Sequence, residues 1–178
     1  MSSGNAAAAT AAAAAGTGTL PKLLLDTNVW VDYAEGNPAT IQSIMHILDA
    51  RTKKRAVLYV SPLSLKDAFY LIQLRSKRAL EAERGSCSPG DYLAIQDMAA
   101  ACVRMFIDFA LVVPLGHNEC LHAMSLRPVH GDFEDDLIVA AAARVNADYL
   151  VSSDKRLRHH APVACLTPQE AAVLLTQG

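Results

Sequence analysis

The sequence has no long apolar run, no excess of one charge and few aromatic residues. In its 178 residues no apolar stretch approaches the roughly 20 that cross a membrane as a helix, so we expect no membrane-spanning segment. The 16 lysines and arginines against 18 aspartates and glutamates give a net charge of −2, which excludes a uniformly basic nucleic-acid-binding domain. Because 52% of the residues are hydrophobic, an intrinsically disordered chain is excluded as well, and the length fits one domain.

Cysteine is also scarce, and an export signal is missing. The four cysteines are scattered and form no CxxC pair. Residues 6–15 are nine alanines and one threonine, but no basic stretch precedes them and alanine makes a poor signal-peptide core. We therefore expect reduced thiols in a cytoplasmic protein. Residues 1–20 are expected to form a disordered alanine-rich tail, and residues 21–178 the folded domain.

One short segment combines three residues that bind zinc in other proteins. His117, Cys120 and His122 lie within six residues of each other. A structural zinc site normally adds a second ligand pair further along the chain, and none is visible here. We therefore expect these three residues to be ordinary side chains on a helix surface.

Short apolar runs alternate with helical patterns along the chain. Such alternation predicts a mainly parallel sheet of four to five strands between layers of helices, an α/β three-layer sandwich. The expected strands are 23–25, 57–60, 111–113, 149–151 and 163–166. The expected helices are 39–53, 63–84, 90–109, 117–126, 133–146 and 168–175, with another beginning near residue 27. Ligands collect at the carboxyl ends of parallel strands, so residues that follow each run are the candidates for chemistry.

Carboxylates from four segments converge on that edge. Asp26 follows the first strand directly, and Asp154 follows the fourth. The others are Asp67 in the helix after the second strand, and Asp132, Glu134, Asp135 and Asp136 around the start of the 133–146 helix. Converging carboxylates repel each other unless a cation binds between them. Magnesium prefers oxygen ligands and activates water for attack on a phosphodiester, so the pattern indicates a metal-dependent phosphodiesterase.

Each acid also has a purely structural interpretation. Asp26 and Asp132 are suited to cap the helices that follow them, with Asp135 at the partner position of the second cap. Glu134 and Asp136 favour a helix N-terminus and are expected to be solvated. Asp154 suits a turn, whereas Asp67 stands among apolar positions and is harder to explain structurally.

Four stretches resemble the motifs of PIN domains, the nuclease fold of VapC-type toxins. They are Leu23–Trp30 (LLLDTNVW), Ser61–Asp67 (SPLSLKD), Asp132–Ala142 (DFEDDLIVAAA) and Asn146–Asp154 (NADYLVSSD). Together the resemblance runs from about residue 23 to residue 166, in the order that the family has.

The resemblance implies a site and an activity. The catalytic and metal-binding acids would be Asp26, Asp67, Asp135 and Asp154, and the supporting residues Thr27, Asn28, Ser152, Ser153 and Asp132. The family's activity implies an endoribonuclease that depends on Mg²⁺ or Mn²⁺. Its members are commonly homodimeric toxins neutralised by a small antitoxin protein.

Basic residues must surround such a site to bind RNA. Three runs are available, at 51–55, 75–78 and 155–160. We interpret the first two as solvated helix faces. The third follows Asp154, and we expect RNA contacts from Lys155, Arg156 and Arg158. Trp30 and Tyr33 are expected in the core or a dimer contact rather than stacked on bases.

Other functions fit the pattern less well. The main alternative is a catalytically silent PIN-like module that binds RNA or a protein. A phosphoacceptor receiver domain needs a lysine after its last strand, where Thr167 and Pro168 stand. A haloacid-dehalogenase phosphatase needs a second aspartate two residues after Asp26, where Asn28 stands.

Overall fold

The computed structural model describes residues 19–130 and 132–177, so most of the segment expected as a tail, residues 1–18, lies outside the described residues. The described part contains one sheet whose five strands pair in parallel in the order β3-β2-β1-β4-β5. The strands are β1 (Lys22–Leu25), β2 (Val57–Val60), β3 (Leu111–Val112), β4 (Tyr149–Val151) and β5 (Cys165–Leu166). The predicted three-layer α/β fold is confirmed, with all pairings parallel.

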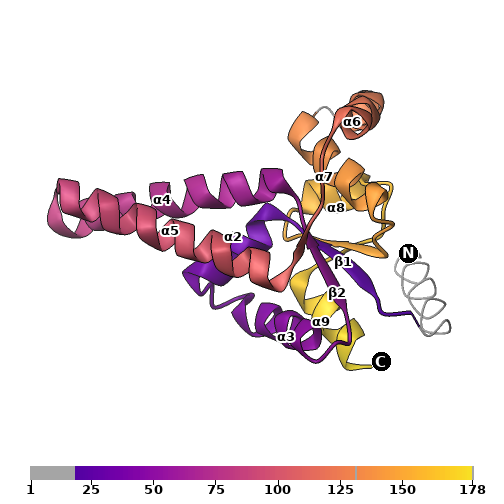
Figure 1. Cartoon of the computed structure of the whole chain (residues 1–178), viewed down its shortest axis with the longest axis horizontal. Coiled ribbons are helices and arrows are strands. Elements are labelled where there is room, and N and C mark those ends of the chain that lie inside the picture. The colour runs from indigo at the N-terminus through magenta and orange to yellow at the C-terminus, as the bar shows by residue number, and fades with distance from the viewer. Residues whose placement is uncertain (1–18, 131, 178) are drawn as a thin grey trace, which may run out of the picture.

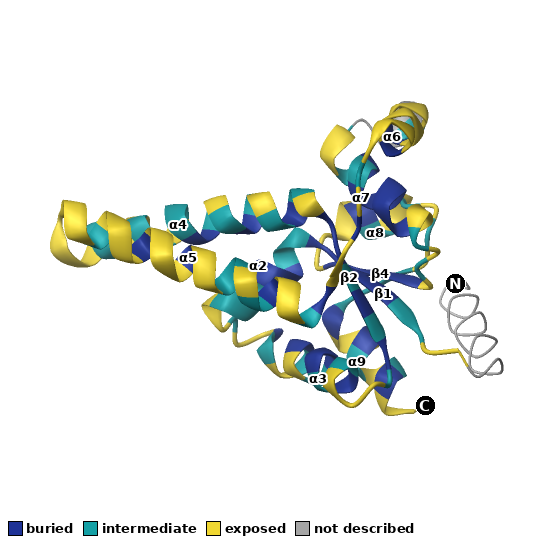
Figure 2. Ribbon diagram, viewed as in Figure 1, coloured by how far each residue is buried: buried dark blue, intermediate teal, exposed yellow. Residues whose placement is uncertain are grey.

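Helices cover both faces of this sheet, as Figures 1 and 2 show. They are α2 (Thr27–Glu35), α3 (Ile41–Thr52), α4 (Pro62–Arg84), α5 (Pro89–Phe109), α6 (His117–His130), α7 (Phe133–Arg144), α8 (Lys155–His160) and α9 (Pro168–Thr176). Buried residues of α2, α3, α4, α5 and α9 form one core, and those of α7 and α8 form the other. None of the helices in the described ranges is long and apolar enough to cross a membrane.

β1 lies at the centre of the sheet, and both of its faces are buried. Leu23, Leu24 and Leu25 have no exposed surface. Because successive strand residues point to opposite faces, Leu24 joins the α7 core and its two neighbours join the other. Trp30 is in that second core: its ring is 4.8 Å from the ring of Phe106, and it is fully buried, as the core interpretation predicted.

α4 and α5 form a long hairpin that extends well beyond the sheet (Figure 1). The sequence marks its helix ends clearly. Ser61 caps α4 ahead of Pro62, and Gly85 ends it with a φ of 81°, a conformation that favours glycine. Ser88 and Asp91 then cap each other's backbone at the start of α5. These signals explain why the predicted ranges 63–84 and 90–109 agree with the structure.

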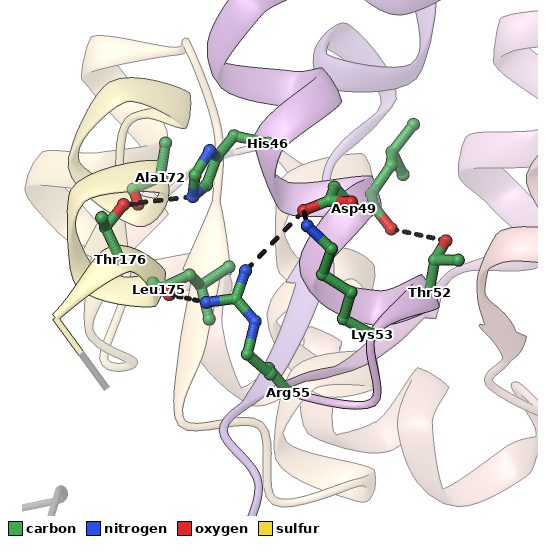
Figure 3. Close-up of polar contacts among 9 residues, drawn as sticks. His46, Asp49, Thr52, Lys53, Arg55, Ala172, Leu175 and Thr176 are labelled. Carbon is green, nitrogen blue, oxygen red and sulfur yellow. Dashed lines mark hydrogen bonds and ion pairs between the residues drawn. The ribbon is translucent and has the colours of Figure 1, made fainter.

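α9 is fixed to α3 by polar contacts at its carboxyl end (Figure 3). Arg55 Nη1 donates to the Leu175 carbonyl at 3.0 Å, which favours the negative end of the helix. Thr176 Oγ1 donates to the Ala172 carbonyl at 2.8 Å and also lies 3.1 Å from His46 Nε2.

α7 differs from the expectation in one important respect. Asp136 was expected to be solvated, but it is fully buried, so that expectation is wrong. The cause is that α7 contacts the sheet through one side and α6 through another. A helix covered on two sides buries more of its circumference than the single apolar stripe that its sequence indicates.

Candidate active site

Asp26 is the first residue after β1 and the N-cap of α2. Its Oδ1 accepts a hydrogen bond from the Thr27 backbone nitrogen at 2.6 Å. Its Oδ2 accepts one from Asn28 Nδ2 at 2.6 Å and another from Ser152 Oγ at 2.7 Å. Only 7% of the residue is exposed. Asp26 therefore caps the helix, as its structural interpretation held, and its carboxylate orientation is fixed by three donors.

A hydrogen-bond network joins the ends of β1 and β4. Asn28 Nδ2 donates to Ser152 Oγ at 3.0 Å, and the Asp154 backbone nitrogen donates to the same hydroxyl oxygen at 3.0 Å. Asn28 Oδ1 accepts from the Ser153 backbone nitrogen at 2.9 Å. Ser152 is fully buried at the centre of this network. The sequence identified these residues as supports of Asp26, and the structure brings them together, Ser153 through its backbone only.

Two further acids cap the helices at this edge. Asp132 Oδ1 accepts from the backbone nitrogens of Glu134 at 3.0 Å and Asp135 at 3.4 Å, which confirms that it caps α7. Asp154 Oδ1 accepts from the Arg156 nitrogen at 2.6 Å and from the Leu157 nitrogen at 3.3 Å, so it begins α8 rather than a simple turn. Both caps engage the Oδ1 atom of the carboxylate.

These segments enclose a cleft of about 240 Å³ at the carboxyl edge of the sheet. Its walls come from α2, α4, the first turns of α7 and the end of β4. The lining residues are Asp26, Thr27, Asn28, Val31, Asp32, Leu71, Arg75, Glu134, Asp135, Ile138 and Asp154. Three of the four predicted catalytic acids therefore share one cleft, and the fourth, Asp67, does not line it.

The carboxylates in the cleft raise each other's pKa. Burial, with repulsion from Asp132, Asp26 and Asp154, raises the pKa of Asp135 from 3.8 to about 6. Burial is also the main reason why the pKa of Asp26 is raised; Asp154 adds to the effect, and the bond from Ser152 opposes it. Each ionised carboxylate therefore makes the next one costlier, and a bound cation relieves this cost.

Asp67 lies next to the cleft, in contact with a different acid. It pairs with Lys66 Nζ through Oδ1, whereas its Oδ2 is buried without a hydrogen-bond partner. Burial and the neighbouring Asp67 carboxylate raise the pKa of Glu134, which lines the cleft. Glu134 is exposed, as expected, but it also lines the cleft, which the sequence did not indicate. From the first turn of α7 it contacts Asp67 of α4 and also lines the cleft.

The three basic runs lie differently from each other. Of the described residues, Arg75 on α4 lines the cleft, but Lys155, Arg156 and Arg158 do not. Arg156 is close enough to Asp135 to oppose the rise of its pKa. Arg158 is half-buried and lies near Cys165, where its charge opposes the rise in the pKa of the thiol that burial causes. The 51–55 run belongs to the end of α3 and to the contact with α9.

The chain belongs to the PIN-domain family, whose sequence profile matches residues 22–156. Solved structures share its fold. VapBC2 from Rickettsia felis, bound to a DNA fragment from its promoter, superposes with a TM-score of 0.58 at 15% identity, over 82% of this chain and 98% of the other. VapBC-1 from nontypeable Haemophilus influenzae gives 0.52 at 14% identity, over 83% and 98%. No curated protein matches the sequence.

The donor set of the cleft fits the divalent ion that PIN nucleases generally use. Its acidic side chains offer hard oxygen ligands, the buried Asp67 Oδ2 lacks a partner, and Mg²⁺ needs only one or two carboxylates besides water and phosphate. Among the described residues, no three histidine, cysteine, aspartate or glutamate side chains are arranged to hold an ion as they stand. Neither the predicted acids nor His117, Cys120 and His122 on α6 form such a group among the described residues.

Proposed function

We propose that the protein is a divalent-metal-dependent endoribonuclease that hydrolyses RNA phosphodiesters, with Mg²⁺ or Mn²⁺ as its cofactor. One observation carries the proposal: the end of β1, the end of β4 and the start of α7 deliver Asp26, Asp154 and Asp135 to one cleft. The raised pKa values of Asp26 and Asp135 indicate a site that gains from positive charge. Membership of the PIN-domain family supports a nuclease, and the acidic cleft supports metal-dependent hydrolysis of a phosphodiester.

In the proposed mechanism, Asp26, Asp135 and Asp154 would hold the ion, with Asp67 and Glu134 as the adjoining acidic pair. When bound, the ion polarises the phosphoryl oxygen and lowers the pKa of an attacking water. Asn28 and Ser152 keep Asp26 Oδ2 in one orientation, so the carboxylate need not reorganise during the reaction. By analogy with the family, the products carry a 5′-phosphate and a 3′-hydroxyl.

We also propose that the protein is a VapC-type toxin, a homodimer that acts in the cytoplasm and is neutralised by a small antitoxin. The likeness of its fold to the VapBC structures supports this role. The test is whether a short open reading frame next to the gene relieves growth arrest when both are expressed. If expression of this protein alone leaves growth unchanged, the toxin role is wrong, although a nuclease activity would stand.

The activity is tested with purified protein and end-labelled RNA in the presence of Mg²⁺ or Mn²⁺. We expect cleavage that EDTA abolishes, and a rate loss on the order of a hundredfold in Asp26→Asn. Asp108→Asn is the matched control, because Asp108 is an exposed partner of Arg104 on α5, outside the cleft. Equal activity of Asp26→Asn and wild type would refute the proposal. RNA binding without metal-dependent turnover would favour the silent binding module.

A further inference from the structure

Arg75 is the one cation among the described residues that line the cleft, where five carboxylates surround the same space. Asp67, Leu71 and Arg75 are spaced by four residues, so they share one face of α4. Arg75 lies two turns beyond Asp67, roughly 12 Å along the helix axis. Along α4, Arg75 is therefore well separated from Asp67, although it lines the same cleft as Glu134.

An ion pair fixes Arg75 in this position. Its Nη1 lies 2.7 Å from Glu35 Oε2, and Glu35 is the last residue of α2. Half of the Arg75 side chain remains exposed. A guanidinium group has five N–H donors, so the contact with Glu35 leaves others directed to solvent. The pair thus holds a cation at the cleft wall without burying it.

This arrangement suits a phosphate group. An acidic cleft repels an RNA backbone, and a guanidinium matches two phosphate oxygens at once. We propose, on the basis of the nuclease function above, that Arg75 binds an RNA phosphate flanking the cleaved bond and that Glu35 positions it. Because a flanking phosphate keeps its charge during the reaction, the contact strengthens binding of the substrate and of the transition state equally.

The rival interpretation is an ordinary surface ion pair between α2 and α4. Exposed pairs of this kind contribute little to stability and nothing to substrate affinity. The two interpretations differ in what they predict for KM and for salt dependence, which a structural pair leaves unchanged.

The test compares Arg75→Ala with Arg78→Ala, a control that removes the same charge from an exposed position on α4 outside the cleft. For single-stranded RNA cleaved with Mg²⁺, we expect KM to rise about tenfold in Arg75→Ala while kcat stays within about twofold. Binding is measured by fluorescence anisotropy in an Asp26→Asn background. The slope of log K against log salt should decrease by about 0.7, the value for one phosphate contact with single-stranded nucleic acid. Arg75→Lys should restore the slope, and Arg78→Ala should change neither quantity.

The failure of this inference is distinguishable from that of the proposed function. If wild type cleaves RNA and Arg75→Ala has the same KM and salt slope, Arg75 is only a structural partner of Glu35. An equal loss in Arg78→Ala would also overturn the assignment, because it would indicate a general charge effect. If wild type neither binds nor cleaves RNA, the nuclease function itself is wrong.

Discussion

In the absence of metal, the ionised Asp135 carboxylate should lower the free energy of unfolding of the protein. Its pKa is raised from 3.8 to about 6 by burial and by neighbouring carboxylates. At 1.36 kcal/mol per pH unit, the full shift corresponds to about 3 kcal/mol of unfavourable ionisation. The side chain is partly exposed, and solvent screens such interactions, so we expect about half of this, roughly 1.5 kcal/mol.

The perturbation is Asp135→Asn, which removes the charge and keeps the shape. Since the carboxyl holds its proton more tightly in the folded state, wild type loses stability as pH rises from about 4 to 6. The variant lacks this loss. In EDTA at pH 7 it should therefore be more stable, by roughly 3 to 6 °C in Tm for a chain of this size, and below about pH 4 the difference should vanish.

The assay is thermal or urea unfolding across this pH range, with Asp97→Asn on the exposed face of α5 as the control. The control should match wild type to within about 0.5 kcal/mol at every pH. Mg²⁺ should stabilise wild type more than Asp135→Asn, because the ion relieves the repulsion that the substitution has already removed. A variant less stable than wild type at pH 7, or a difference independent of pH, would refute the electrostatic reasoning.

Two further predictions follow from buried polar contacts. Ser152→Ala should lower the free energy of unfolding by about 1 to 3 kcal/mol in urea titrations and reduce RNA cleavage at least tenfold, because Asp26 loses a donor and buried groups lose a partner. Glu119→Gln should cost about 1 to 2 kcal/mol by the same measurement without changing KM, since Glu119 is buried, lies 2.7 Å from Arg144, and neither residue lines the cleft. A Ser152→Ala protein with full activity, or a Glu119→Gln protein with altered KM, would contradict these assignments.

The order of strands and helices could be predicted because the signals are local. Three successive leucines before Asp26 mark a strand with two buried faces, and Pro62, Gly85 and Ser88 mark helix ends. The order in which strands pair is a long-range property. β1 lies between β2 and β4, and no local pattern states which distant strand will be its neighbour.

The site could be predicted only as far as its position relative to the strands. Asp26 and Asp154 follow strands directly, so their convergence was foreseeable. The burial of Asp136 was not, because helix periodicity does not reveal that α6 also packs against α7. The contact of Glu134 with Asp67 was not either, because no local pattern states which distant residue the first turn of α7 will face. Arg75 carried a usable signal in its spacing of eight residues from Asp67, which places both on one face of α4.

The hydrogen bonds of Asp26 also determine when the cleft can form during synthesis of the chain. The hydroxyl that orients its carboxylate belongs to a residue 126 positions later in the chain. At translation rates of 5 to 20 residues per second, the ribosome takes roughly 6 to 25 s to cover that separation. Until then the first strand lacks its β4 neighbour and the first acid lacks its partners. A nascent chain therefore leaves the ribosome with an incomplete acidic cleft, which forms only after Asp154 has emerged.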